Sequence, residues 1–172
     1  QEWHASTQAI KTMIAAGQSA EALERLERNA ALEQAFFGTN INARSLRADA
    51  KFWLGDYDGS VADFAQVADA LGDFRAPTLF VFPPQIPQLS LLNRTQFRTY
   101  LGIARSLMFK GDYEGALPWA EAAEQLFEET HYSWQHQLYS AYLKIDADMF
   151  NSRGVNLAVI AAARLALNKG AE

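Results

Sequence analysis

The sequence predicts an all-α protein made of about four helical hairpins, or about eight helices, and two observations support this fold class. The first is a repeated motif. The segment Gly55-Asp56-Tyr57-Asp58-Gly59 returns as Gly111-Asp112-Tyr113-Glu114-Gly115, both times between two apolar runs of helical period. In each copy the first glycine can end one helix in a left-handed cap, and the aspartate can cap the next helix. The second observation is that no segment reads convincingly as a strand.

The composition is that of an ordinary soluble globular protein. The 172 residues are 49% hydrophobic and 20% charged, which suffices for one domain with a sizeable core. A net charge of −5 argues against non-specific binding to nucleic acid, and no apolar run approaches the roughly 18 residues of a membrane span. The absence of cysteine excludes disulfides and thiolate metal sites, and no cofactor is implied.

The chain begins at Gln1 rather than at methionine, so we expect that a segment before Gln1 has been lost. That segment could be a signal peptide or the rest of a longer protein, and the helical pattern already in progress from residue 3 favours a longer protein. The composition fits the cytoplasm and the periplasm equally well.

The apolar spacing places the hairpins in order along the chain. In the first hairpin, Gly17 stands at the elbow, Ser19 is the expected cap of the second helix, and Ala22 is the small residue where the two helices cross. The second and third hairpins contain the two copies of the motif, with Ser60 and Ala116 as the small residues. The expected hairpins lie at about 3–37, 40–71, 93–129 and 133–168, the last with its turn at 151–154.

The segment 72–92 departs from this pattern and reads as an insertion. Its four prolines exclude a long helix, so the first helix of the third hairpin is expected to begin at Asn93 or Thr95. The apolar run at 79–82 is unusual for a free linker. It can be an ordered loop that covers the edge between neighbouring repeats, which we favour, or a docking arm that presents an apolar strip to a partner.

The hairpins resemble the tetratricopeptide repeat family. The elbow glycines are 38 residues apart (17 to 55) and 56 apart (55 to 111), and the first spacing is near the repeat length of about 34. The matching residues are the two Gly-Asp-Tyr elbows, the small residues that follow them, and the packing residues Phe64, Ala104, Ala120 and Ala123. The resemblance implies one domain over 1–172 whose hairpins stack into a right-handed superhelix.

The resemblance also implies where a partner would bind. In this family the first helix of each hairpin lines a concave face that holds a peptide or a protein. The partner-binding residues that this implies, together with two from a basic stripe on the second hairpin, are Lys11, Asn42, Arg44, Arg47, Asp49, Phe52, Arg98, Leu101, Arg105 and Met108. Because Asp49 lies in the same groove, we do not expect a clamp for a terminal carboxylate.

The basic stripe is the clearest departure from the family pattern. Arg44, Arg47 and Lys51 share one helix face, where the third hairpin has apolar Tyr100, Ile103 and Leu107. Three unpaired cations are too costly to bury, so the stripe must be solvated, paired with acids, or directed at an anionic ligand. We favour a solvated face bridged to nearby acids such as Asp49 or Asp56, with the helix packing instead through Leu46, Ala50 and Trp53.

Chemistry-bearing motifs are scarce. Glu124, Glu128, His131 and His136 come nearest to a metal cluster, but the two histidines are five residues apart and no thiols join them, so a coincidental cluster is favoured. The sequence contains no Gly-x-Ser-x-Gly, no His-Glu-x-x-His and no phosphate loop. We therefore do not expect an enzyme.

These observations predict a scaffold that binds a protein or a peptide on the concave face of a helical-repeat superhelix. The alternative is a regulatory or sensory module of a larger protein, which would bind a small ligand or a second copy of itself as a homodimer.

Overall fold

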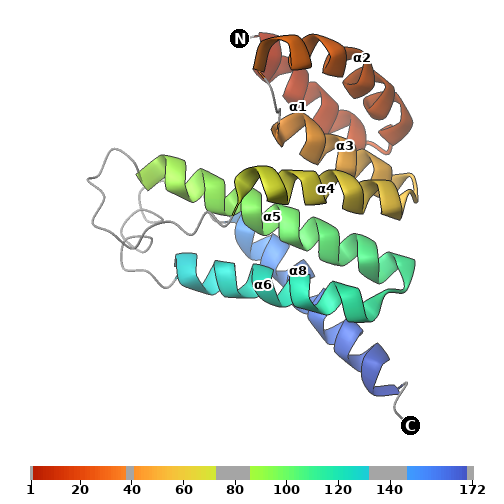
Figure 1. Cartoon of the computed structure of the whole chain (residues 1–172), viewed down its shortest axis with the longest axis vertical. Coiled ribbons are helices and arrows are strands. Elements are labelled where there is room, and N and C mark those ends of the chain that lie inside the picture. Colours follow the sequence, from red (N-terminus) through yellow and green to blue (C-terminus); the bar gives the residue numbers. More distant parts are fainter. Residues whose placement is uncertain (1, 38–40, 73–85, 132–146, 170–172) are drawn as a thin grey trace. The chain divides into compact units, whose positions relative to one another are not determined.

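The computed structural model describes residues 2–37, 41–72, 86–131 and 147–169, and side chains at 7–28, 41–72, 94–128 and 151–168. These ranges contain seven α-helices and no strand, which confirms the all-α prediction (Figure 1). The helices are α1 (Glu2–Ala15), α2 (Ser19–Phe37), α3 (Ile41–Trp53), α4 (Tyr57–Leu71), α5 (Ile86–Lys110), α6 (Tyr113–His131) and α8 (Ala147–Lys169). They fall into two compact units, Gln1–Ala70 and Leu71–Glu172.

In the first unit, α1, α2 and α3 each pack against the other two. Their common core consists of Ile10 from α1, Ala22 and Leu26 from α2, and Leu46 from α3. Helix α4 is joined to α3 by ion pairs between their side chains, described below.

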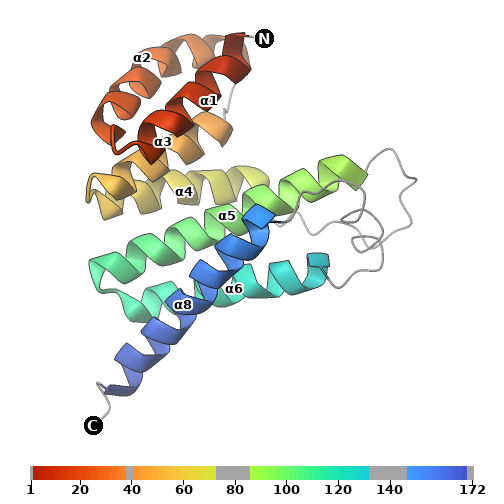
Figure 2. The ribbon, with the colours of Figure 1, turned by 180° about the vertical axis from the view of Figure 1, so that it is seen from behind.

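In the second unit, α5, α6 and α8 also pack pairwise, as the front and back views show (Figures 1 and 2). The core of the unit is built from all three helices: Phe97, Leu101, Ala104, Ala120, Ala123, Phe127, Val159 and Ile160. In both units, therefore, a third helix packs against both members of the preceding hairpin.

The elbow glycines end their helices as the motif predicts. Gly55 has a φ of 81°, its N–H bonds to the Phe52 carbonyl at 3.0 Å, and the Asp56 N–H bonds to the Lys51 carbonyl at 3.0 Å. This pair of bonds is the Schellman motif, which requires a left-handed residue and so favours glycine. The same two bonds recur at Gly17 and at Gly111, whose φ values are 79° and 90°.

The aspartate after each elbow glycine is the N-cap of the following helix, as predicted. Asp56 accepts a hydrogen bond from the Gly59 N–H and Asp112 accepts one from the Gly115 N–H, both at 2.9 Å. A β-carbon at either of these second glycines would collide with the capping carboxylate. The two glycines and the aspartate of the motif therefore form one structural unit, in which the second glycine leaves room for the cap.

The first elbow lacks this side-chain cap, and the expectation for Ser19 is wrong. Gln18 occupies the N-cap position, and its carbonyl accepts the bond from the Ala22 N–H at 3.0 Å. Ser19 is the first residue of α2, and its buried hydroxyl has no hydrogen-bond partner in the described structure. The N-cap lies one residue before the serine, because the position of the glycine fixes the register of the elbow.

Five residues after each elbow glycine stands a small residue that is fully buried. Ala22, Ser60 and Ala116 each have an exposed fraction of 0%. A larger side chain here would push the two helices of the hairpin apart. The three hairpins thus share one register, which allows residues to be compared by their distance from the elbow.

Two boundaries differ from the sequence prediction. Helix α5 begins at Ile86 rather than at Asn93 or Thr95, because Pro87 falls in the first turn, where its missing N–H leaves no bond unmade. The remainder of the expected insertion, 73–85, lies outside the described residues. Whether this segment is a covering loop or a docking arm therefore stays a prediction.

The turn expected at 151–154 within the fourth hairpin is wrong, because these residues are helical. Arg153 of this segment makes a tertiary contact instead of a turn and bonds to Glu124 at 2.7 Å, and Asn156, just after the segment, donates to the Ala120 carbonyl at 2.9 Å. Both bonds join α8 to α6. Most of the helix expected at 133–150 lies outside the described residues, and its last residues belong to α8.

Candidate functional site

The expected partner-binding residues lie on the first helix of each hairpin, and each unit is considered separately. In the first unit, Lys11 on α1 and Asn42 on α3 are exposed, while Asp49 on α3 is half-buried. In the second unit, Arg98 on α5 is exposed, and Arg105 and Met108 are half-buried.

Two of the expected residues are buried. Phe52 is enclosed beside the rings of Trp53 and Tyr57, with centroids 5.2 and 5.7 Å away, and Leu101 belongs to the core of the second unit. Buried side chains offer little surface to a partner, so we leave both out of the proposed contact surface.

The expectation that Trp53 packs α3 into the core is also wrong. Leu46 and Ala50 are buried as expected, but Phe52 is the packing aromatic, and Trp53 is 62% exposed. Phe109 stands at the same place on α5, two residues before the elbow glycine, and is 55% exposed. Sequence reasoning missed this pair as candidate contact residues, although the aromatic at this position in two elbows was the available signal.

The basic stripe on α3 is paired with an acid that the sequence did not single out. Asp63 of α4 receives two hydrogen bonds from the Arg47 guanidinium, one of them at 2.8 Å from Nε, and lies 2.9 Å from the Lys51 ammonium. Asp63 is only 2% exposed, and Arg44 lies half-buried on the same stripe. The stripe is therefore bridged to an acid, as expected, but that acid is Asp63. Asp56 caps α4 instead.

The ion pairs set the charge states of this cluster. Burial raises the pKa of the Asp63 carboxyl, but the hydrogen bonds and charges of Arg47 and Lys51 lower it by more, so the pKa lies below its ordinary value. The hydrogen bond with Asp63 is the main cause that raises the pKa of Arg47. One carboxylate thus neutralises part of a stripe of three cations, and its function in the fold is to join α3 to α4.

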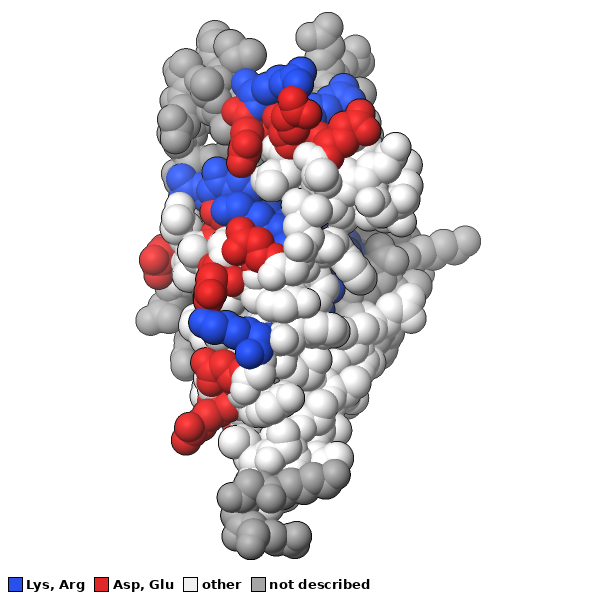
Figure 3. Space-filling model, turned by 90° about the vertical axis from the view of Figure 1, so that its right-hand side faces the viewer, with Lys and Arg blue, Asp and Glu red and all other residues white. Residues whose placement is uncertain are grey.

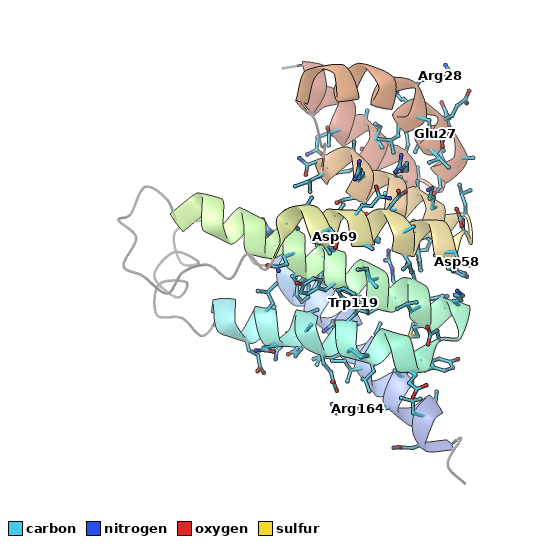
Figure 4. The ribbon with its side chains drawn as sticks, in the orientation of Figure 1. Glu27, Arg28, Asp58, Asp69, Trp119 and Arg164 are labelled. Carbon is cyan, nitrogen blue, oxygen red and sulfur yellow. The ribbon has the colours of Figure 1, made fainter. Side chains whose placement is uncertain are left out.

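The same position in the third hairpin holds an apolar contact. Asp63 is eight residues after its elbow glycine, and so is Trp119 of α6 (Figure 4). The Trp119 ring lies against that of Tyr100, with centroids 5.4 Å apart. Tyr100 is in turn the equivalent of Arg44. The chain therefore uses two chemistries at one structural position.

The acidic residues of the expected metal-like cluster are engaged by an arginine. Arg153 of α8 bonds to Glu124 at 2.7 Å, lies 3.7 Å from Glu128, and stacks over the Phe127 ring at 4.5 Å. Side chains at 131 and 136 lie outside those described. In the part of the chain that the structure describes, no three His, Cys, Asp or Glu side chains are grouped to hold a metal ion.

The surface charge is mixed on the face shown in Figure 3, where basic and acidic side chains lie next to one another. Among the described helices, none combines the length and the apolar composition that crossing a membrane requires.

Comparisons with protein-family models, with curated proteins and with solved structures found no match to this chain.

Proposed function

We propose that this chain is a helical-repeat scaffold of the tetratricopeptide type, which binds a protein or a peptide along the first helices of its hairpins. The observation that carries the proposal is the shared register of three hairpins. Each has a left-handed elbow glycine, and each has a fully buried small residue five positions later. In this proposal the hairpins stack into a right-handed superhelix, and α1, α3 and α5 line its concave face.

The packing within each unit supports stacking. In a stack of hairpins, the first helix of one repeat touches both helices of the repeat before it. Helix α3 packs against both α1 and α2, and α8 packs against both α5 and α6. In the proposal, α8 therefore takes the place of a following first helix.

The proposed contact surface combines aromatic and charged side chains. On α5 it consists of Arg98, Arg105 and Phe109, and on α3 of Asn42, Asp49 and Trp53. Tryptophan and arginine supply much of the binding energy in protein interfaces, because they bury large areas and form several polar contacts. Arg98 and Phe109 are eleven residues apart on α5, about 16 Å along the helix axis. They suit an extended peptide whose acidic and apolar residues are about five positions apart.

The experiment uses a displayed peptide library, selected on the full chain. The affinity of a selected peptide is then measured by fluorescence anisotropy for the wild type and for Arg98→Ala and Phe109→Ala. We expect each substitution to weaken binding by about tenfold. The matched controls are Arg28→Ala on α2 and Tyr113→Ala on α6, which remove an exposed arginine and an exposed aromatic from second helices and should change the affinity less than twofold.

The proposal fails if no peptide is enriched, or if the α5 variants bind as the wild type does while retaining its circular dichroism spectrum. Loss of binding in the control variants alone would move the site to the second helices.

A further inference from the structure

The outer face of α8 is apolar and uncharged over three turns. Val155, Leu157 and Leu165 are 46%, 46% and 56% exposed, and Ala158, Ala161 and Ala162 between them are also exposed. The opposite side of the same helix buries Asn156, Val159, Ile160 and Ala163 in the second unit. A helix that is apolar on both sides normally lies between two layers, whereas among the described residues only one layer, formed by α5 and α6, packs against α8.

The one charged residue between 154 and 165 pairs with an acidic residue of α6. Arg164, labelled in Figure 4, bonds to Glu121 of α6 at 2.7 Å, and both side chains are exposed. The face therefore offers no charge to a ligand or to a charged partner. Its occupant must be apolar itself, and the exposed ion pair resembles the polar rim of a protein interface.

The order of side-chain sizes identifies the occupant. Val155, Ala158, Ala162 and Leu165 form one stripe with spacings of three, four and three residues. The stripe reads large, small, small, large in both directions about residue 160. When two such helices lie antiparallel, Val155 of one copy faces Leu165 of the other, and Ala158 faces Ala162. The alanines at the centre allow the helix axes to approach closely.

We propose that the outer face of α8 is a homodimer interface, in which two copies of the chain pair their α8 helices antiparallel about a two-fold axis near Ile160. A two-fold interface presents the same patch from both copies and so requires a self-complementary pattern, which this stripe provides. The face shares no residue with the proposed peptide surface, so either proposal can fail alone. One helix pair buries a small area, which predicts a weak dimer.

The first test is sedimentation equilibrium of the full chain from about 1 to 500 µM, the range in which a small interface would associate. We expect a reversible monomer–dimer equilibrium. Ala162→Glu places a carboxylate at the centre of the stripe and should raise the dissociation constant by about 100-fold or more. The matched control is Ala62→Glu, the same change at an exposed position of α4, and it should dimerise as the wild type does. A wild type that stays monomeric, or an unaffected Ala162→Glu, would overturn the proposal.

The second test fixes the register and does not depend on the folding of Ala162→Glu. Because the chain has no cysteine, single cysteines can be introduced without background. An equimolar mixture of Ala158→Cys and Ala162→Cys should oxidise mainly to the mixed disulfide, because these positions face each other across the axis. A statistical mixture, in which the mixed disulfide is only about half of the product, or no disulfide at all, would contradict the antiparallel pairing. Larger assemblies in sedimentation would show that the face binds in an open chain, which also overturns the closed dimer.

Discussion

The hairpins α3–α4 and α5–α6 have the same backbone plan but opposite chemistry between their helices. Both close with the same elbow, the same aspartate cap and a fully buried small residue. Between the helices, the second unit packs Tyr100 against Trp119, whereas the first unit pairs Arg47 and Lys51 with Asp63. The elbow and the small residue therefore fix the hairpin, while the contact made eight residues after the elbow glycine can be ionic or apolar.

The apolar contact and the ionic contact are expected to respond differently to mutation. An apolar contact loses area gradually when one side chain is shortened. An ionic contact depends on both charges, because removing one side chain leaves the opposite charge unpaired in a site that is partly shielded from water.

The largest effect is expected from removing the shared carboxylate. Asp63→Ala leaves the Arg47 and Lys51 side chains, 28% and 21% exposed, without their counter-charge. We expect a loss of about 2–4 kcal/mol in the free energy of unfolding, less than for a fully buried pair because both cations keep some water. Urea unfolding followed by circular dichroism measures it. Asp69→Ala, an exposed acid on the same helix (Figure 4), should stay within about 0.5 kcal/mol. Equal losses of stability for the two variants would show that the ion pairs of Asp63 do not stabilise the hairpin.

The next prediction replaces the ionic set by the apolar one. In the shared register, Arg44→Tyr, Arg47→Ile, Lys51→Leu and Asp63→Trp convert the second hairpin to the chemistry of the third. We expect the fourfold variant to match the wild type or to exceed it by about 1–2 kcal/mol, since apolar replacement of a buried ion pair is often neutral or stabilising. Asp63→Trp alone should be destabilised, because it keeps the cations and adds bulk. A fourfold variant less stable than Asp63→Ala would show that the two hairpins are not equivalent.

The elbow should behave alike in both hairpins, whatever lies between their helices. Gly55→Ala and Gly111→Ala force a β-carbon into the left-handed region, and each should cost about 1–2 kcal/mol. Gly154→Ala is the matched control, because it lies within α8 and its new β-carbon would meet nothing within 4 Å. There alanine should stabilise by about 0.5–1 kcal/mol through helix propensity. Thermal unfolding at low protein concentration distinguishes a loss of stability from a gain. A loss of stability for Gly154→Ala would contradict the helical assignment of residue 154.

Local signals explain which parts of the fold could be predicted from the sequence. The elbows were predictable because glycine and aspartate act on their own neighbours, so Gly55, Asp56 and their counterparts specify the cap by themselves. The turn at 151–154 was mispredicted because Arg153 is fixed by Glu124, 29 residues earlier in the chain. A local pattern cannot show that a turn-forming residue has a tertiary partner.

The candidate site shows the same limit. The sequence identified the stripe of Arg44, Arg47 and Lys51 because the helical period brings its members onto one face. It did not identify Asp63, because the acid comes from the next helix and its partners depend on how two helices cross. Comparing hairpins by their distance from the elbow would have found it, since Asp63 stands where Trp119 does.

The smallest effect is a dependence on pH that only one hairpin should show. The pKa of Asp63 is lower in the folded chain than its ordinary value of 3.8, so the unfolded chain binds the proton more readily. The stability from this pair is therefore fully present above pH 3.8 and is lost as the pH falls through the folded pKa. The pKa of Arg47 is raised by the hydrogen bond with Asp63, so the guanidinium stays charged throughout.

Other carboxylates titrate in the same range, so the informative quantity is the difference between two proteins. The fourfold variant has a tryptophan at residue 63 and lacks this titration, whereas its other acids are those of the wild type. We expect the melting temperature of the wild type to fall more between pH 5 and about pH 2.5 than that of the variant. Parallel curves would mean that the Asp63 carboxyl titrates alike in the folded and unfolded chains, and the ion pairs would then stabilise the hairpin no more than two exposed charges do.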